Sequence, residues 1–208
     1  MTKRDMDYLV GAYLGDGTYY NKYGIRFTVA GSDEDYADVL MDLLKDYHPI
    51  KTKEKTGVIR VVAGNKEKPL AHYFCCKKTN RQQDKSKNGV WGDISSVRHF
   101  DELIAGLIDT DGSVRDRGAW KQNYKKNIRE ITFSQRHKSN IDKVIPIMEE
   151  LYLYPSVGKK MTYKDGRELY SISIAHWTQV EIFKRMVKLR HPRKAKILAY
   201  KWPPNLCK

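Results

Sequence analysis

Two aspartates occupy the same place in two similar nine-residue segments, and this pairing indicates metal-dependent chemistry. Leu9–Gly17 reads LVGAYLGDG and Ile104–Gly112 reads IAGLIDTDG, with Asp16 and Asp111 each directly before the final glycine. Carboxylate oxygens are hard ligands that suit Mg²⁺ better than a soft metal. Two carboxylates that hold divalent metals beside a phosphate diester can activate water and stabilise the leaving oxygen, so we predict phosphodiester hydrolysis.

The two segments are predicted to form helices that pack against each other. Gly11 and Gly15 lie four residues apart on one helical face, as do Gly106 and Thr110. Small residues let helices approach more closely than the usual ~8 to 10 Å, because that distance is set by the side chains at the contact. The pairing is therefore expected to bring the two aspartates together. The glycine that ends each segment is expected to supply the left-handed residue that stops the helix.

The elements that follow each segment also repeat, which predicts a duplicated unit of helix, two strands, helix, two strands and helix. The matched pairs are strands Ile25–Val29 and Ile131–Ser134, helices that open at Ser32 and Ser139, strands Val58–Val62 and Tyr170–Ile174, and closing helices Leu70–Cys75 and Trp177–Val187. We assign residues 1–95 to the first repeat, with a polar linker from about residue 77, and residues 96–208 to the second. The two repeats are expected to form one compact monomer.

The charge balance favours an anionic partner. The chain has 39 Lys and Arg against 25 Asp and Glu, a net charge of +14, which favours nucleic acid. No run approaches the roughly 18 apolar residues of a membrane span, and the first residues lack the pattern of a signal peptide. We therefore expect an intracellular protein that does not bind membranes. The three cysteines and six histidines show no spacing typical of a disulfide framework or a zinc site.

The paired segments resemble the motifs of the LAGLIDADG homing endonucleases, in the single-chain form with two motifs. IAGLIDTDG matches the consensus at seven of nine positions, and LVGAYLGDG is the looser match. The resemblance implies an α+β fold: a duplicated αββαββα unit with pseudo-twofold symmetry and a DNA-binding β-saddle. It also implies an intron-encoded, site-specific endonuclease that cuts both DNA strands across the minor groove of a long, nearly asymmetric target, leaving short 3′ overhangs.

The resemblance assigns roles to the residues that match the motif. Asp16 and Asp111 would be catalytic and bind Mg²⁺, with Mn²⁺ as a substitute, and the carbonyls of Gly15 and Thr110 would join the metal. Asp109, the other motif acid, is usually structural in this family. Its place in the first copy is occupied by Leu14, so the acid is not needed twice.

Two further polar positions of the family have candidates in this chain. Gln135 matches a glutamine at the end of the strand before the second helix of a repeat, whereas the first copy offers Ala30 and Gly31 there. Lys194 and Lys196 are candidates for a catalytic lysine near the end of a repeat.

Strand alternation predicts which residues face DNA. Ile25, Phe27 and Val29 should point inward, so their neighbours point outward, and the same alternation applies around Ile131 and Phe133, where Glu130 would also face outward. A curved sheet can lie along the major groove, where Arg suits guanine and Lys suits phosphate. The candidate DNA-binding residues, which include part of a long basic hairpin over residues 115–127, are Arg26, Thr28, Arg60, Arg115, Arg117, Lys125, Lys126, Thr132, Ser134, Arg136, Lys159, Lys160 and Tyr163.

Two non-cleaving functions remain alternatives. An intron maturase uses this fold to bind intron RNA and aid splicing, and a DNA-binding regulator would use it without cutting. Both aspartates are retained, which favours the nuclease, with double-stranded DNA as its partner and no obligate protein partner. Mg²⁺-dependent cleavage of DNA separates these functions.

Overall fold

Two four-stranded antiparallel sheets share one topology, with strand orders β1-β2-β4-β3 and β5-β6-β8-β7. The computed structural model describes residues 1–20, 23–68, 70, 74, 91, 94, 96–116, 129–164 and 166–199. The strands are β1 Gly17–Tyr19, β2 Ile25–Val29, β3 Ile50–Lys53, β4 Ile59–Ala63, β5 Gly112–Asp116, β6 Arg129–Gln135, β7 Ser156–Thr162 and β8 Glu168–Ile174. The helices in the described part are α1 Lys3–Gly15, α2 Glu34–Leu43, α5 Phe100–Thr110, α6 Lys138–Glu150, α7 Trp177–Met186 and α8 Pro192–Ala199, with 3₁₀ turns at Gly31–Asp33 and Lys45–Tyr47. The predicted α+β duplication is confirmed.

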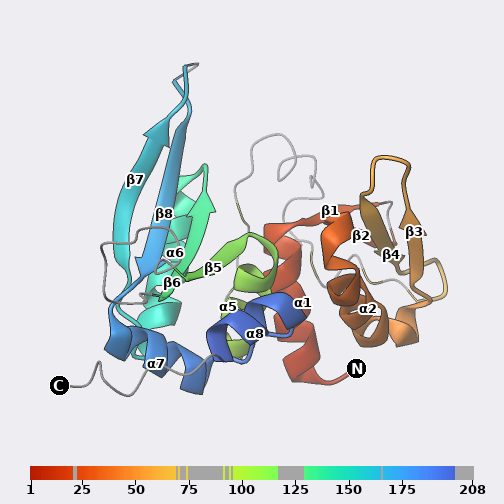
Figure 1. The fold of residues 1–208 in the computed structure, drawn as a ribbon. Helices are drawn as coiled ribbons and strands as arrows, with labels where there is room; N and C mark the ends of the chain where they lie inside the picture. Colours follow the sequence, from red (N-terminus) through yellow and green to blue (C-terminus); the bar gives the residue numbers. More distant parts are fainter. Residues whose placement is uncertain are drawn as a thin grey trace.

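Helices α1 and α5 form the centre of the molecule, with one sheet on each side (Figure 1). They approach so closely that a Cβ atom on Gly11 would lie 2.1 Å from the Leu103 carbonyl oxygen. A Cβ atom on Gly106 would lie 2.1 Å from the Tyr8 carbonyl oxygen. The predicted close packing of the two motif helices is therefore confirmed, and it depends on both glycines.

The glycines that end the two motifs have a different role from the one predicted. Gly17 and Gly112 begin β1 and β5, and neither is among the glycines with positive φ. A Cβ atom on Gly17 would lie 2.5 Å from the Cα of Tyr13, and one on Gly112 would lie 2.6 Å from the Cα of Ile108. These glycines are therefore required because the strand leaves close to the preceding helical turn, and a left-handed conformation is not involved.

The helix starts follow from local caps and from one carboxylate on a neighbouring helix. Thr2 and Asp5 form a capping box at the start of α1. Asp7 of α1 is fully buried and accepts hydrogen bonds from the backbone nitrogens of Arg98 and His99, directly before α5. The first motif helix therefore stabilises the start of the second.

Two predicted helix starts were shifted. Ser32 lies in the 3₁₀ turn Gly31–Asp33, so α2 begins at Glu34, and α6 begins at Lys138, one residue before Ser139. Of the predicted closing helix Leu70–Cys75, the structure describes Leu70 and Phe74 alone, and most of the linker lies outside the described residues.

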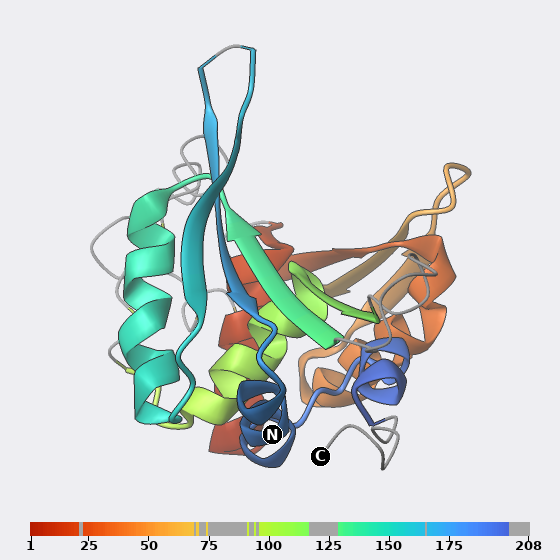
Figure 2. The ribbon, with the colours of Figure 1, turned by 60° about the vertical axis from the view of Figure 1, so that its left-hand side comes forward.

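Each sheet has helices on one face. Helix α2 packs on β2, β3 and β4, whereas α6 packs on β6 and β8 and α7 packs on β6. Ile25, Phe27 and Val29 are buried on the covered side, while Thr28 is exposed, which confirms the predicted alternation in β2. The β7–β8 hairpin extends well beyond the body of the molecule, and every residue of β7 is exposed (Figure 2). No helix in the described part of the chain is long and apolar enough to cross a membrane.

Candidate active site

Each motif aspartate lies at the end of its own helix, next to the end of the other motif helix. Asp16 is the C-cap of α1 and Asp111 is the C-cap of α5. A Cβ atom on Gly15 would lie 2.0 Å from Thr110 Oγ1 and 3.3 Å from the backbone nitrogen of Asp111, so the two helix ends touch. Asp16 is exposed and Asp111 is partly exposed. Both carboxylates can therefore be reached by a ligand on the strand side of the helices.

Gln135 is positioned to orient Asp111. It is the last residue of β6, and its Nε2 donates a hydrogen bond to Asp111 Oδ2. Behind it, Asn140 Nδ2 of α6 donates to Gln135 Oε1 at 3.2 Å, and Asn140 Oδ1 accepts from the backbone nitrogen of Trp91 at 2.9 Å. Asn140 is fully buried. The sequence reading missed Asn140 because a single asparagine near a helix start is common.

The position that corresponds to Gln135 in the first half is Val29. Gly17 pairs with Phe27 and Gly112 pairs with Phe133, so these two phenylalanines are equivalent. Val29 and Gln135, each two residues further along, are therefore equivalent as well. This register corrects the predicted correspondence of Gln135 with Ala30 or Gly31 by one to two residues. Val29 is buried and apolar, so β2 supplies no side-chain donor at this point.

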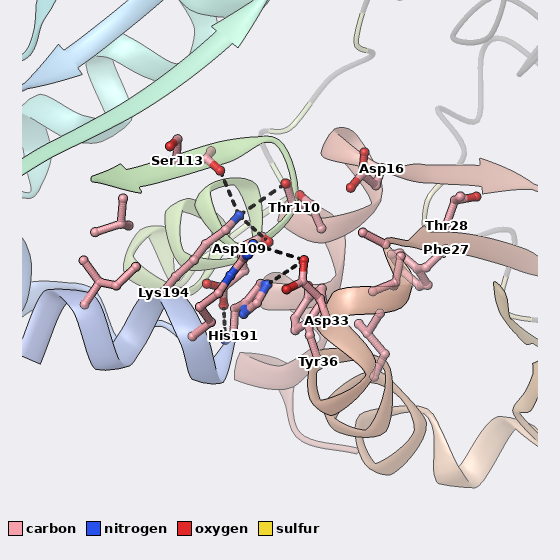
Figure 3. Close-up of a pocket in the computed structure, with 17 residues that line it drawn as sticks. Asp16, Phe27, Thr28, Asp33, Tyr36, Asp109, Thr110, Ser113, His191 and Lys194 are labelled. Carbon is pink, nitrogen blue, oxygen red and sulfur yellow. Dashed lines mark hydrogen bonds and ion pairs between the residues drawn. The ribbon is translucent and has the colours of Figure 1, made fainter. Parts of the chain in front are cut away.

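A cavity of about 440 Å³ lies beside Asp16, between the first sheet and α8 (Figure 3). Its lining includes Asp16, Val29, Thr110 and Lys194. The structure thus brings together three of the residues predicted to be catalytic or to bind the metal, Asp16, Thr110 and Lys194, at the ends of α1 and α5 and on α8. Lys196 is exposed and is absent from the lining of this cavity.

Lys194 caps the end of α5 with its ammonium group. Its Nζ donates to the carbonyl oxygens of Ile108, Asp109 and Gly112, each at 2.8 Å, and lies 3.4 Å from that of Thr110. A positive charge at a helix C-terminus is favoured by the helix dipole. Burial lowers the pKa of Lys194, although nearby Asp109 and Asp16 oppose that shift. The side chain is therefore both a structural cap and a group whose proton is held less tightly than in an exposed lysine.

Asp109 stabilises the start of α8. Its Oδ2 accepts from the Tyr8 hydroxyl at 2.8 Å and from the backbone nitrogens of Arg190 and His191 at 2.7 and 3.0 Å. Burial raises the pKa of Asp109 to about 6, against these three hydrogen bonds and the charge of Lys194. These hydrogen bonds hold the start of α8, which carries Lys194, against α5. This geometry fits the structural role that the resemblance implied.

Arg190 and His191, directly before α8, also connect the two halves. Arg190 donates at 2.7 Å to both Asp5 of α1 and Glu102 of α5, and its guanidinium lies 4.4 Å from the centre of the Tyr8 ring. His191 stacks on Tyr36 of α2 with ring centroids 4.7 Å apart. Sequence reading missed these residues, although an Arg-His pair precedes both α5 and α8 and both pairs donate backbone hydrogen bonds to a buried aspartate.

Most of the described DNA-binding candidates lie on strands of the two sheets. Arg26 and Thr28 alternate with the buried residues of β2, and Thr28 pairs with Arg60 across the sheet. Lys160 lies 3.5 Å from Ser134 Oγ on the outer face of the second sheet, whereas Lys159 pairs with Glu168. The remaining described candidates are the partly buried Thr132 and Tyr163 and the exposed Arg115 and Arg136. Arg117, Lys125 and Lys126 lie outside the described residues.

Glu130 lies on the predicted outer face of β6 but is not exposed. Its carboxylate accepts a hydrogen bond from Ser173 Oγ at 2.9 Å, and Ser173 pairs with Thr132 in the neighbouring strand. Because Glu130 is buried, its carboxylate is not open at the sheet surface as predicted.

The oxygen atoms at the two helix ends suit a hard divalent cation whose remaining ligands are substrate phosphates and water. Asp16, Asp111 and the carbonyls of Gly15 and Thr110 offer oxygen atoms at two touching helix ends. Within the described residues, no group of three or more His, Cys, Asp or Glu side chains could hold a metal ion. Mg²⁺ commonly binds through one or two carboxylates together with substrate phosphates and water. The residues therefore fit Mg²⁺ in a complex with a phosphodiester.

The architecture is that of the LAGLIDADG homing endonucleases. No family model and no curated protein sequence matches the chain. Among solved structures, the homing endonuclease I-WcaI bound to its DNA recognition sequence has a TM-score of 0.59 and 17% identity, covering 96% of this chain and 88% of that one. I-DmoI in complex with DNA and Ca has a TM-score of 0.58 and 15% identity, covering 95% and 98%. I-SmaMI bound to uncleaved DNA in the presence of calcium ions has a TM-score of 0.61 and 11% identity, covering 91% and 86%. At these identities the likeness establishes the fold.

Proposed function

We propose that this protein is a site-specific DNA endonuclease of the LAGLIDADG type that requires a divalent metal. The observation that carries the proposal is the contact between the two helix ends that present Asp16 and Asp111, between two sheets of equal topology. Solved proteins with the same architecture are homing endonucleases bound to DNA, two of them with calcium. The net charge of +14 supports a polyanionic partner.

The residues divide the work of phosphodiester hydrolysis. Asp16 and Asp111, with the carbonyls of Gly15 and Thr110, would hold Mg²⁺, or Mn²⁺ in its place. The metal supplies activation of water and stabilisation of the leaving oxygen. Gln135 fixes the orientation of the Asp111 carboxylate. Lys194 neutralises the end of α5, and its place beside Asp16 in the cavity lining makes it the candidate for the catalytic lysine.

The outer faces of the two sheets are proposed to bind the duplex. The helices occupy the other face of each sheet, which leaves Arg26, Thr28, Arg60, Thr132 and Ser134 toward DNA. The two halves differ in sequence, so we propose a long target with little palindromic symmetry. We also propose that each strand is cut across the minor groove to leave short 3′ overhangs, and that the protein acts as an intracellular monomer encoded within an intron.

Cleavage of a randomised duplex library tests the proposal. The library is incubated with Mg²⁺ and either the wild type or the double variant Asp16→Asn/Asp111→Asn, and the new ends are sequenced. We expect cuts within one long asymmetric motif, and no cuts by the variant. Binding of DNA or intron RNA without any cut would instead favour the regulator or the maturase.

A further inference from the structure

The carboxylate of Asp33 does not cap the helix that it precedes. Asp33 is the N-cap residue of α2, a position that favours aspartate because its side chain can accept a hydrogen bond from the first helical turn. Its side chain makes no such bond to α2. Asp33 is only 8% exposed, and among the described residues its Oδ1 has no hydrogen-bond partner. This departure from the local rule at a buried carboxylate indicates a role outside α2.

The other oxygen of Asp33 faces the C-terminal helix, which belongs to the second half of the chain. Arg193 Nη2 donates to Asp33 Oδ2 at 3.2 Å, and His191 Nε2 lies 3.6 Å from the same oxygen. Burial lowers the pKa of His191, and the charge of Lys194 acts in the same direction, so the imidazole is neutral at pH 7 and Arg193 supplies the positive charge. The His191 ring stacks on Tyr36 of α2. The first half therefore holds the start of α8 through a carboxylate and an aromatic ring.

Asp33 and Asp109 hold α8 in different ways. Asp109 of α5 accepts hydrogen bonds from the two backbone nitrogens directly before α8, and these bonds fix the place where the helix begins. The ion pair of Arg193 with Asp33 is made by a side chain, so it fixes how α8 is turned about its axis. Neighbouring residues on a helix are about 100° apart. A rotation of α8 that separates Arg193 from Asp33 therefore also moves Lys194.

The contacts of Lys194 depend on that rotation. Its Nζ reaches the carbonyl oxygens at the end of α5, including that of Gly112 at 2.8 Å, and its side chain lines the cavity together with Asp16 and Asp33 (Figure 3). Lys194 is only 8% exposed. A buried ammonium group is stable only while its hydrogen bonds are made. A small displacement of α8 is therefore sufficient to move this group out of the cavity.

We propose that Asp33 is a positioning residue that acts through Arg193 and α8 to hold Lys194 in the cavity, so that the first half places the candidate catalytic lysine of the second half. The effect on catalysis rests on the proposed nuclease function, whereas the placement of Lys194 does not. A hydrogen bond to a charged group contributes about tenfold or more in an equilibrium or a rate. Because the Arg193 side chain is 57% exposed, solvent weakens the pair, and we expect about fivefold effects.

The first test measures the release of Lys194 without DNA or metal. The protein is acetylated briefly with sulfosuccinimidyl acetate, and each lysine is followed by peptide mass spectrometry. In the wild type, Lys194 should react more slowly than Lys196, which is exposed on the same helix. Asp33→Asn should raise the rate at Lys194 about fivefold and leave Lys196 within about twofold. Asp38→Asn is the matched control, because Asp38 of α2 pairs with Lys51 in the first half, and it should change neither rate.

The second test determines whether Asp33 acts through Lys194. Single-turnover cleavage with Mg²⁺ is measured on the duplex selected from the library. Asp33→Asn should slow cleavage about fivefold and leave the Kd for DNA within about twofold. Lys194→Met should slow cleavage further, and the double variant Asp33→Asn/Lys194→Met should cut at the rate of Lys194→Met, because no lysine is left to position. Losses that multiply in the double variant would overturn the inference.

The inference and the nuclease function fail in different ways. Unchanged acetylation of Lys194 in Asp33→Asn would refute the placement. Faster acetylation with unchanged cleavage would refute the positioning role and leave the nuclease intact. Absence of cleavage by the wild type with DNA bound would refute the nuclease, and acetylation alone would then decide the placement. If Asp33→Asn does not fold, Arg193→Met, which removes the same ion pair from an exposed side chain, is read in the same way, and Arg193→Lys should recover part of the effect.

Discussion

Replacement of Gly106 by alanine should separate the motif helices. The added Cβ would lie 2.1 Å from the Tyr8 carbonyl oxygen, 1.3 Å short of the 3.4 Å at which ordinary contact begins, and 2.6 Å from the backbone nitrogen of Ala12. Backbone atoms of a helix cannot rotate away, so the cost should reach the upper end of overpacking, about 3 kcal/mol. Alanine regains about 1 kcal/mol of helix propensity. We therefore expect a net loss of about 2 kcal/mol in the free energy of unfolding.

Urea unfolding measures this loss, and Gly158→Ala is the matched control. A Cβ on Gly158, in exposed β7, meets nothing within 4 Å, so that variant should stay within about 0.5 kcal/mol of the wild type. The double variant Gly11→Ala/Gly106→Ala should lose less than the sum of the singles, because one separation of α1 and α5 relieves both contacts. If Gly106→Ala unfolds at the same urea concentration as Gly158→Ala, the close packing of α1 and α5 is refuted.

Three other changes test the electrostatics. Arg190→Met leaves the carboxylates of Asp5 and Glu102 without their shared partner and should cost about 2 kcal/mol in urea unfolding, with Arg190→Lys recovering part of it; equal stability of Arg190→Met and the wild type would contradict this. Burial opposes ionisation of Asp5, but hydrogen bonds from Thr2 and Arg190 lower its pKa to about 2 from 3.8. The ionised Asp5 carboxylate therefore contributes to the free energy of unfolding above about pH 4, and this contribution is lost as the pH falls toward 2. In acid titrations, Asp5→Asn should flatten the dependence of the free energy of unfolding on pH between about pH 4 and 2. An unchanged pH dependence would refute the assignment. DNA affinity should fall roughly 10³-fold between 50 and 200 mM salt if about six phosphates are contacted, whereas a flat response in a filter-binding assay would place the positive charge away from the ligand.

The duplication was readable from sequence because local patterns carry it. Asp16 and Asp111 hold equivalent places in two segments, the small-residue spacing gave the helix pairing, and alternation gave β2 and β6. The repeat predicted two strands after each motif helix, but the bounds of the short strands β1 and β5 could not be assigned, because they follow the motif glycines with no alternation of their own. Glycine at those positions reflects close approach to the preceding helix, which a sequence pattern does not distinguish from a left-handed stop.

The contacts around the site could not be predicted, because they join residues that are distant in sequence. The bond from Gln135 to Asp111 spans 24 residues and that from Lys194 to Gly112 spans 82. The sequence offered both Lys194 and Lys196 as candidates, and only the fold shows that Lys194 is the one that reaches α5. The correspondence of Gln135 with Val29 likewise needed the strand register.

Cleavage and binding by Asp111→Asn test the central claim most directly. The substitution keeps the shape of the side chain and removes the charge that would hold the metal, while Gln135 can still hydrogen-bond to the remaining oxygen. On the duplex selected by the wild type, with Mg²⁺, we expect cleavage of both strands to be lost or reduced by at least about 10³-fold, because the missing carboxylate contributes a charge-stabilising interaction. Binding of the same duplex without metal should stay within about threefold of the wild type, since the proposed DNA contacts lie on the strands. An Asp111→Asn variant that cuts at the wild-type rate would contradict the account.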